Sequence, residues 1–313
     1  MYDYTGVESA LDWADPTVHN LLEALGHRPS SRVSVNFRPP NLPFRSELLQ
    51  VRELKGWRPP SDADCYLGVN PIPASVRRGR GTDDDVTRVV ALFADLDIKA
   101  DCLATMDECR EVAARLSKLL GASPVALVET GHGLQPYWRI ASPPQCSNVI
   151  RDDEDNDTRL SREEWRRLYL RWGGLVKQIV REVRPGASID NVYNLSRILR
   201  APDSVNRKHT PVDVTMTLST GSVPVTWREI NAVLDRVNAV PLSGTVRADV
   251  RRPCRRAWVK RSTGSIVSLA HSSTSKNYCR WGGIGRWSIS STTTVWCGRS
   301  STEPGKTRPP TRR

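Results

Sequence analysis

The chain lacks the features that would place it in a membrane or outside the cell. It contains no apolar run long enough to span a bilayer. Its first four residues lack the basic start of a signal peptide, and no apolar core follows them. The seven cysteines include no Cys-x-x-Cys pair, which argues against a zinc site and against a disulfide framework. We therefore expect a cytoplasmic protein with no membrane partner.

Acidic residues are almost missing from the last part of the chain. Residues 251–313 hold fourteen Lys or Arg and one acid, Glu303, whereas the whole chain has a net charge of +12. Residues 1–250 therefore carry 32 basic and 33 acidic residues, a charge of −1. The basic character belongs to the tail, so net charge is no argument that the folded core binds nucleic acid.

Composition also divides the chain into two parts. We expect a folded domain over residues 1–245 and a tail over 246–313, where Ser and Thr are dense and no helical or strand period persists. The tail is predicted to be disordered or not to be a native reading frame. Its four Trp and three Cys favour the second interpretation, because disordered arms are usually poor in both. The alternative is a basic arm that binds the phosphates of nucleic acid.

Hydrophobic periodicity predicts strands and helices intermixed along the chain, which indicates an α+β or α/β class. The predicted helices cover residues 15–26, 104–119, 162–182 and 226–237, with a further short helix in the stretch that carries Arg197 and Arg200. The predicted N-caps are Asp15, Ser161 and Thr226. The predicted strands cover residues 32–37, 65–69, 89–94, 124–129 and 211–217, and a glycine hairpin covers 130–138.

The apolar stretch 89–94 predicts a buried strand that ends in two carboxylates, Asp95 and Asp97. Side chains two apart on a strand point to the same face, so these carboxylates would lie together. Keeping both ionised needs a cation, and Mg²⁺ is typically held by one or two carboxylates together with substrate phosphates. The alternative is a strand that simply ends in solvent.

Two glycine-rich stretches carry further candidate residues. In the hairpin, Gly131 and Gly133 would allow the backbone to approach a ligand closely, and His132 lies at the tip, where plain solvent exposure is the alternative. The loop 77–81 interleaves three arginines with glycines. Such a loop can approach phosphates closely, and the alternative is an ordinary solvated loop. It leads into residues 83–85, three Asp that predict a solvated turn or a helix cap.

Three motifs, in this order, resemble the archaeo-eukaryotic-type primase superfamily, most closely the primase-polymerase domain of phages and mobile elements. They are the Asp-x-Asp of Asp95 and Asp97, the glycine hairpin, and Asp190 followed by the stretch from Arg197 to Lys208. The resemblance covers about residues 30–220. It implies an α+β primase-polymerase fold with a central mixed or antiparallel sheet flanked by helices.

The resemblance implies a template-dependent nucleotidyltransferase that makes or extends primers in phage or mobile-element replication. Asp95, Asp97 and Asp190 would be catalytic and would hold two Mg²⁺ or Mn²⁺ ions. The implied nucleotide-binding residues are His132, Gln135, Arg197, Arg200, Asn206 and Lys208. The implied partners are a single-stranded DNA template and nucleoside triphosphates. A helicase would be a separate protein, because the chain has no P-loop.

The two arginines are predicted to share one face of their short helix, since they are three residues apart. Both guanidiniums would then hold phosphate oxygens bidentately. The alternative is that one arginine pairs with a core carboxylate, for example Asp190.

The sequence departs from the family pattern at two places. Gln135 stands where many members carry His, and it can donate a hydrogen bond but cannot carry a positive charge. Asp203 replaces the glycine of Pro-Gly-Thr, at a position where the backbone is expected to adopt a positive φ. Two other functions therefore stay open: a two-metal nuclease, and a catalytically impaired replication protein that binds DNA.

Overall fold

The computed structural model describes residues 17–143, 146–150, 159–243, 257–260 and 266–269. The chain divides into two compact units, Met1–Ala248 and Asp249–Arg313. The described residues of the second unit form one antiparallel strand pair, β12 (Ala257–Lys260) with β13 (Ile266–Leu269). This pair lies within the tail, where composition predicts no regular structure.

The first sheet has the strand order β2-β1-β3-β8, and all its pairings are antiparallel. Its strands are β1 (Arg32–Arg38), β2 (Arg45–Gln50), β3 (Asp64–Gly68) and β8 (Ile198–Arg200). The predicted short helix around Arg197 and Arg200 is therefore wrong. Leu199 lies opposite Leu67 of β3, so pairing with an open sheet edge overrides the local preference of this segment.

The second sheet has the order β11-β6-β7-β4, and β5 also pairs with β7. Its strands are β4 (Ala91–Phe93), β5 (Leu96–Asp97), β6 (Ala126–Glu129), β7 (Gly133–Arg139) and β11 (Thr215–Leu218). A separate pair joins β9 (Val205–Asn206) to β10 (Val212–Asp213). The predicted hairpin is confirmed as β6–β7, and the predicted strand 211–217 is divided between β10 and β11.

The four α-helices in the described part of the chain lie where periodicity predicts them. They are α1 (Val18–Ala24), α2 (Met106–Leu120), α3 (Arg162–Val183) and α4 (Trp227–Arg236), and two 3₁₀ turns are η3 (Val51–Leu54) and η4 (Asp83–Asp85). The predicted caps Ser161 and Thr226 are confirmed, and each forms a capping box. The predicted cap Asp15 is wrong, because Thr17 accepts the capping hydrogen bond of α1 from the Asn20 amide.

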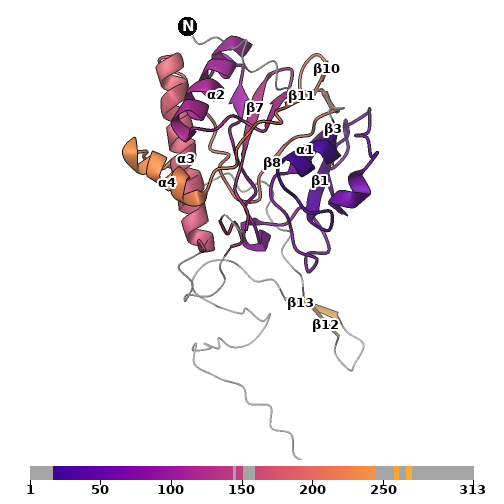
Figure 1. Ribbon diagram of the computed structural model, residues 1–313. Helices are drawn as coiled ribbons and strands as arrows, with labels where there is room; N and C mark the ends of the chain where they lie inside the picture. Colours follow the sequence, from indigo (N-terminus) through magenta and orange to yellow (C-terminus); the bar gives the residue numbers. More distant parts are fainter. Residues whose placement is uncertain (1–16, 144–145, 151–158, 244–256, 261–265, 270–313) are drawn as a thin grey trace, which may run out of the picture. The chain divides into compact units, whose positions relative to one another are not determined.

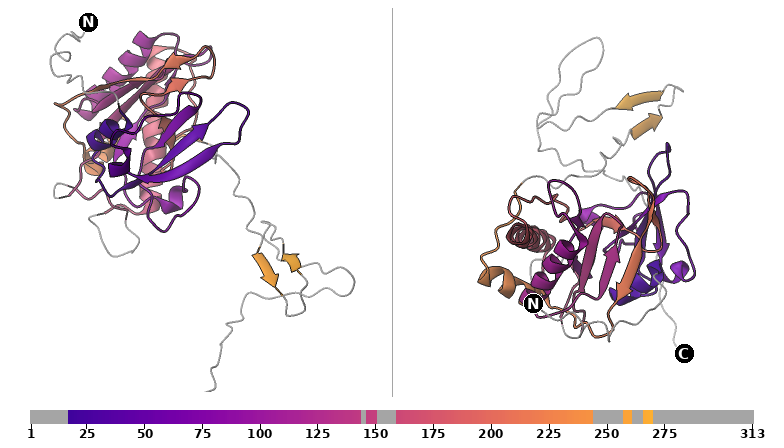
Figure 2. Two further views of the ribbon diagram at one scale, coloured as in Figure 1. Left: turned by 90° about the vertical axis from the view of Figure 1, so that its right-hand side faces the viewer. Right: turned by 90° about the horizontal axis from the view of Figure 1, so that it is seen from above.

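Helices α2 and α3 cover one face of the second sheet, with α4 beside them (Figures 1 and 2). Trp172 of α3 donates its indole N–H to the Phe93 carbonyl, and the Tyr169 hydroxyl donates to the Ala91 carbonyl. Trp138 of β7 packs edge-on against Trp172, with 5.4 Å between ring centroids. These contacts hold β4, and hence the carboxylates that follow it, against α3. The α+β class with antiparallel sheets flanked by helices is confirmed.

None of the helices in the described residues has the length and apolar character needed to cross a membrane. In the same part of the chain, Cys65, Cys102, Cys109 and Cys146 are buried free thiols.

Candidate active site

The Asp-x-Asp motif lies where the second sheet is interrupted. Asp95 occupies the break between β4 and β5, and Asp97 ends β5, which pairs with the first residues of β7. Gly133 of β7 lies opposite Asp97, and a Cβ at this position would overlap the Leu96 carbonyl oxygen. The second glycine of the hairpin therefore lets β7 approach β5 closely enough for its side chains to reach the carboxylates.

Asp95 is held by two side chains from distant segments. Gln135 of β7 donates its amide N–H to Asp95 Oδ1 at 2.9 Å, and Arg197 Nη2 lies 3.6 Å from Asp95 Oδ2. Gln135 is only 5% exposed, so its amide is directed at this carboxylate rather than at solvent. The residue at the first departure from the family pattern thus positions Asp95.

Asp97 and Asp190 meet at one ammonium group. Lys99 Nζ lies 3.3 Å from Asp97 Oδ2 and 3.1 Å from Asp190 Oδ2. Burial raises the pKa of Asp97, and the charge of Asp95 adds to this effect, while Lys99 and Lys208 act in the opposite direction. Burial acts to lower the pKa of Lys99, but its contacts with Asp190 and Asp97 raise it overall. The ammonium therefore stays charged and is the local counter-ion.

The three carboxylates are oxygen donors of the kind that Mg²⁺ and Mn²⁺ take. Burial and the neighbouring charge of Asp95 both disfavour the ionised form of Asp97, and a divalent cation beside Asp95 and Asp97 would relieve this cost. Lys99 stands between Asp97 and Asp190. Within the described ranges, no three His, Cys, Asp or Glu side chains are grouped as a metal site. An ion shared by Asp97 and Asp190 would have to displace this ammonium, and metal binding stays a prediction.

The two candidate arginines point to different partners. Arg200 donates to Asp64 Oδ1 at 2.7 Å, lies 4.5 Å over the Tyr66 ring and is only 8% exposed. The expected shared helix face is wrong, because Arg200 lies in strand β8 and Arg197 directly precedes this strand. The alternative, that one arginine pairs with a core carboxylate, is confirmed for Arg200, although the carboxylate is Asp64 and not Asp190. The sequence analysis did not single out Asp64 as a partner of Arg200.

The tip of the β6–β7 hairpin packs against the end of β9 and the residues that follow it. Asn206 is buried, and its amide donates to the Thr130 carbonyl at 2.7 Å, which ties the hairpin turn to that segment. The rings of His132 and His209 meet edge-on, with centroids 5.1 Å apart. The exposed Lys208 lies between Asn206 and His209 in the chain. The sequence analysis missed His209, although it directly follows Lys208.

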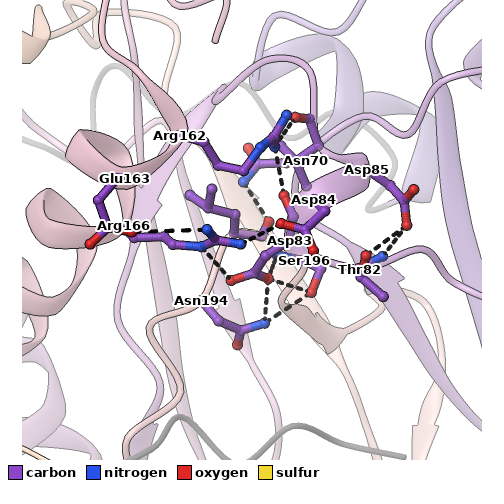
Figure 3. A network of polar contacts seen from close by, with 12 residues as sticks. Asn70, Thr82, Asp83, Asp84, Asp85, Arg162, Glu163, Arg166, Asn194 and Ser196 are labelled. Atoms are coloured by element: carbon purple, nitrogen blue, oxygen red, sulfur yellow. Dashed lines mark hydrogen bonds and ion pairs between the residues drawn. The ribbon is translucent and has the colours of Figure 1, made fainter. Parts of the chain in front are cut away.

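A second polar network fixes the segment that carries Arg197 (Figure 3). Asp83 Oδ1 accepts hydrogen bonds from the amide N–H and the hydroxyl of Ser196, at 2.8 and 2.6 Å, and from the Asn194 side chain. Asp83 Oδ2 lies 3.8 Å from Arg166 of α3. The turn η4 is thus more than a solvated turn, because it links α3 to the residues that precede Arg197.

The second departure from the family pattern has a local explanation. Asp203 has a φ of +59°, so the predicted positive φ is confirmed. Its carboxylate lies 2.6 Å from the Arg58 guanidinium. The added negative charge is therefore balanced by Arg58.

The arginine–glycine loop at 77–81 lies beside β2, where Arg77, Arg78 and Gly79 line a cavity of about 370 Å³ together with Arg32. None of the predicted catalytic residues lines this cavity.

No protein-family model matches the chain, and no curated protein matches it. Among solved structures, primase RepB′ aligns with a TM-score of 0.40 and 12% identity, over 71% of this chain and 62% of that one. The polymerase domain of Mycobacterium tuberculosis ligase D, solved in complex with DNA, aligns with a TM-score of 0.32 and 14% identity, over 71% and 86%. The chain thus spans less than two thirds of the RepB′ structure.

Proposed function

We propose that this protein is a template-dependent nucleotidyltransferase of the primase-polymerase type. What carries the proposal is the ion pair through which Lys99 joins Asp190, from a distant segment, to Asp97 of the Asp-x-Asp motif. Lys99 bridges Asp97 and Asp190, and Arg197 contacts Asp95. Carboxylates, a guanidinium and an ammonium at one site suit a reaction in which divalent ions and a triphosphate meet.

Asp95, Asp97 and Asp190 would hold the ions, which stabilise the attacking and leaving oxygens in phosphoryl transfer. Arg197 is close enough to Asp95 to exchange this carboxylate for an incoming phosphate, which it can hold bidentately. Lys208 would act as a point charge on the triphosphate, because its side chain is exposed and its charge reaches Asp97.

The remaining nucleotide-binding residues act by positioning in this proposal. Gln135 orients Asp95, and Asn206 holds the hairpin turn that carries His132. His132 and His209 would face the sugar or the phosphates from the hairpin side. Arg200 has no direct part in nucleotide binding, because Asp64 and the Tyr66 ring already engage its buried guanidinium.

Primer extension on a single-stranded DNA template, with labelled nucleoside triphosphates and Mg²⁺ or Mn²⁺, tests the proposal. We expect Asp95→Asn and Asp97→Asn to lower incorporation at least about 100-fold, because each removes a metal-ligand charge. Asp107→Asn is the matched control, since Asp107 is an exposed residue of α2 that pairs with Arg110 on the same helix. Equal activity of Asp97→Asn and wild type would exclude this catalytic role.

One observation favours a second candidate, a replication protein that binds DNA without catalysis. Lys99 and Arg197 together contact all three candidate carboxylates. These two cations offset most of the negative charge of the site, so it has less need of a metal ion. The two candidates differ in Mn²⁺ binding, followed by electron paramagnetic resonance: the enzyme binds the ion through Asp95 and Asp97, whereas the non-catalytic protein binds DNA and no Mn²⁺.

A further inference from the structure

We infer that Arg28, Arg88 and Arg139 form a second phosphate-binding site, which takes the backbone of a nucleic acid at the end of the second sheet remote from the candidate active site. The site holds for either proposed function, since both require nucleic-acid binding.

The three arginines gather around one turn. Arg88 is 9% exposed, and its Nη2 lies 3.4 Å from both the Gly26 carbonyl oxygen and the Ser31 hydroxyl. Arg139 contacts the same turn, because a Cβ built on Gly26 would lie 2.8 Å from Arg139 Nε. Arg28 follows two residues after Gly26 and is exposed. The Arg28 amide donates to the same Ser31 hydroxyl, and the charge of Arg28 acts on Arg88. A buried, a half-buried and an exposed arginine therefore lie around one turn.

This cluster lacks negative charge. Burial and the charges of Arg28 and Arg139 all act to lower the pKa of Arg88. None of the three arginines pairs with a carboxylate in the part of the chain that the structure describes. By contrast, Arg110, Arg171 and Arg200 each lie within 2.8 Å of an acid oxygen. A buried guanidinium beside like charges is costly unless an anion compensates it.

A phosphodiester fits the cluster better than other anions, for two reasons. Arginine forks bind phosphate oxygens bidentately, and phosphate contacts dominate protein–nucleic acid affinity. The strand β7 also connects the two places, since Gly133 lies at Asp97 and Arg139 ends the strand. Six residues of strand span about 20 Å, which about six base pairs of duplex cover at 3.4 Å each. A nucleic acid held at the candidate active site can therefore reach the cluster.

Fluorescence anisotropy with a labelled primer–template tests this inference on the full chain. The assay contains neither nucleotide nor divalent ion, so failure of the nucleotidyltransferase proposal would not affect it. We expect the double variant Arg28→Gln/Arg139→Gln to bind about tenfold more weakly at 0.15 M salt. The slope of log affinity against log salt should become shallower by about 1 to 2, because up to two phosphate contacts are lost.

The matched control is Arg115→Gln/Arg167→Gln, which removes the same charge from exposed arginines that pair with Glu111 and Glu163 on their own helices. We expect its affinity and salt slope to equal those of wild type. Arg88→Lys tests the buried member, and the exposed double variant keeps the test valid if Arg88→Lys does not fold. Equal salt slopes for the two double variants would overturn the inference.

Two further ligands test whether the arginine cluster binds another anion instead of nucleic acid. Inorganic phosphate is titrated by calorimetry, and polyglutamate replaces the primer–template in the anisotropy competition. The inference predicts that neither binds at micromolar concentration. Arginine-dependent binding of either one, with unchanged DNA affinity of the Arg28→Gln/Arg139→Gln variant, would assign the site to that ligand and overturn the inference.

Discussion

The Lys99 ammonium lies 3.1 Å from the carboxylate of Asp190, which comes 91 residues later in the chain. The same ammonium lies 3.3 Å from Asp97. A lysine of the chain therefore occupies the place where the primase resemblance implies a shared metal ion. Metal binding and the position of Lys99 are consequently linked, since one cation has to leave before the other can bridge the two carboxylates.

Replacing this lysine should strengthen metal binding. We expect Lys99→Met to raise Mn²⁺ affinity about tenfold, which corresponds to about 1.4 kcal/mol, because the ion no longer displaces an ammonium. Electron paramagnetic resonance of free Mn²⁺ measures the affinity directly, without any assay of activity. Lys55→Met is the control, because Lys55 is an exposed lysine that directly follows η3. If Lys99→Met binds Mn²⁺ no better than the control does, the ammonium and the ion do not compete.

The pair formed by Arg200 and Asp64 should be structural. Both side chains are largely buried, with 8% and 13% exposed, so removing one partner leaves an uncompensated charge. We expect Arg200→Met to lower the free energy of unfolding by about 3 kcal/mol in urea titrations. The double variant Arg200→Met/Asp64→Leu should lose less than the two single variants together. Unchanged stability with weakened nucleotide binding would instead restore Arg200 as a triphosphate ligand.

His27 should make stability depend on pH. Its Nε2 lies 3.0 Å from the Val69 carbonyl oxygen, and burial, with the charge of Arg88, lowers its pKa from 6.5 to about 3. The folded state therefore disfavours the protonated ring, so its stabilising contribution is complete above pH 6.5 and is lost as the pH falls toward 3. His27→Gln keeps a donor to Val69 and removes this titration.

We expect the melting temperature of His27→Gln to fall less than that of wild type between pH 7 and pH 5. His19→Gln is the control, because His19 lies on α1 and pairs at the surface with Glu23. Parallel melting curves for wild type and His27→Gln over this range would show that His27 does not contribute to the pH dependence.

Gly133 should tolerate no side chain. A Cβ there would overlap the Leu96 carbonyl, and the glycine has a φ of +157°. We expect Gly133→Ala to destabilise the protein by about 2 kcal/mol or more, from steric overlap and backbone strain. Gly221→Ala is the control, because no atom lies within 4 Å of its added Cβ. Thermal unfolding measures both, and equal melting temperatures would argue against a tight β5–β7 approach.

Deleting residues 251–313 should leave a folded core. The first compact unit ends at Ala248, and its last helix, α4, ends at Arg236. We expect the truncated chain to keep its helical circular dichroism and a cooperative thermal transition. An unfolded or aggregated product would mean that the tail is needed for the fold.

Local information in the sequence determined the helices and the central strand. The periodicity of α2, α3 and α4 and the caps at Ser161 and Thr226 depend on residues within a few positions of one another. The positive φ of Asp203 was predicted from the resemblance, because the family carries glycine at this position. Such features depend on propensity, periodicity and capping, which act over one or two turns.

Only the tertiary structure decided the partners of the charged residues. Arg200 lies on β8 because the edge of β3 is open to it, and this pairing directs its guanidinium to Asp64 instead of a phosphate. Lys99 meets Asp190, and Asp83 holds the segment before Arg197, through contacts between distant parts of the chain. Sequence spacing alone cannot choose among several acids of equal charge, since that choice depends on how the two sheets and α3 pack.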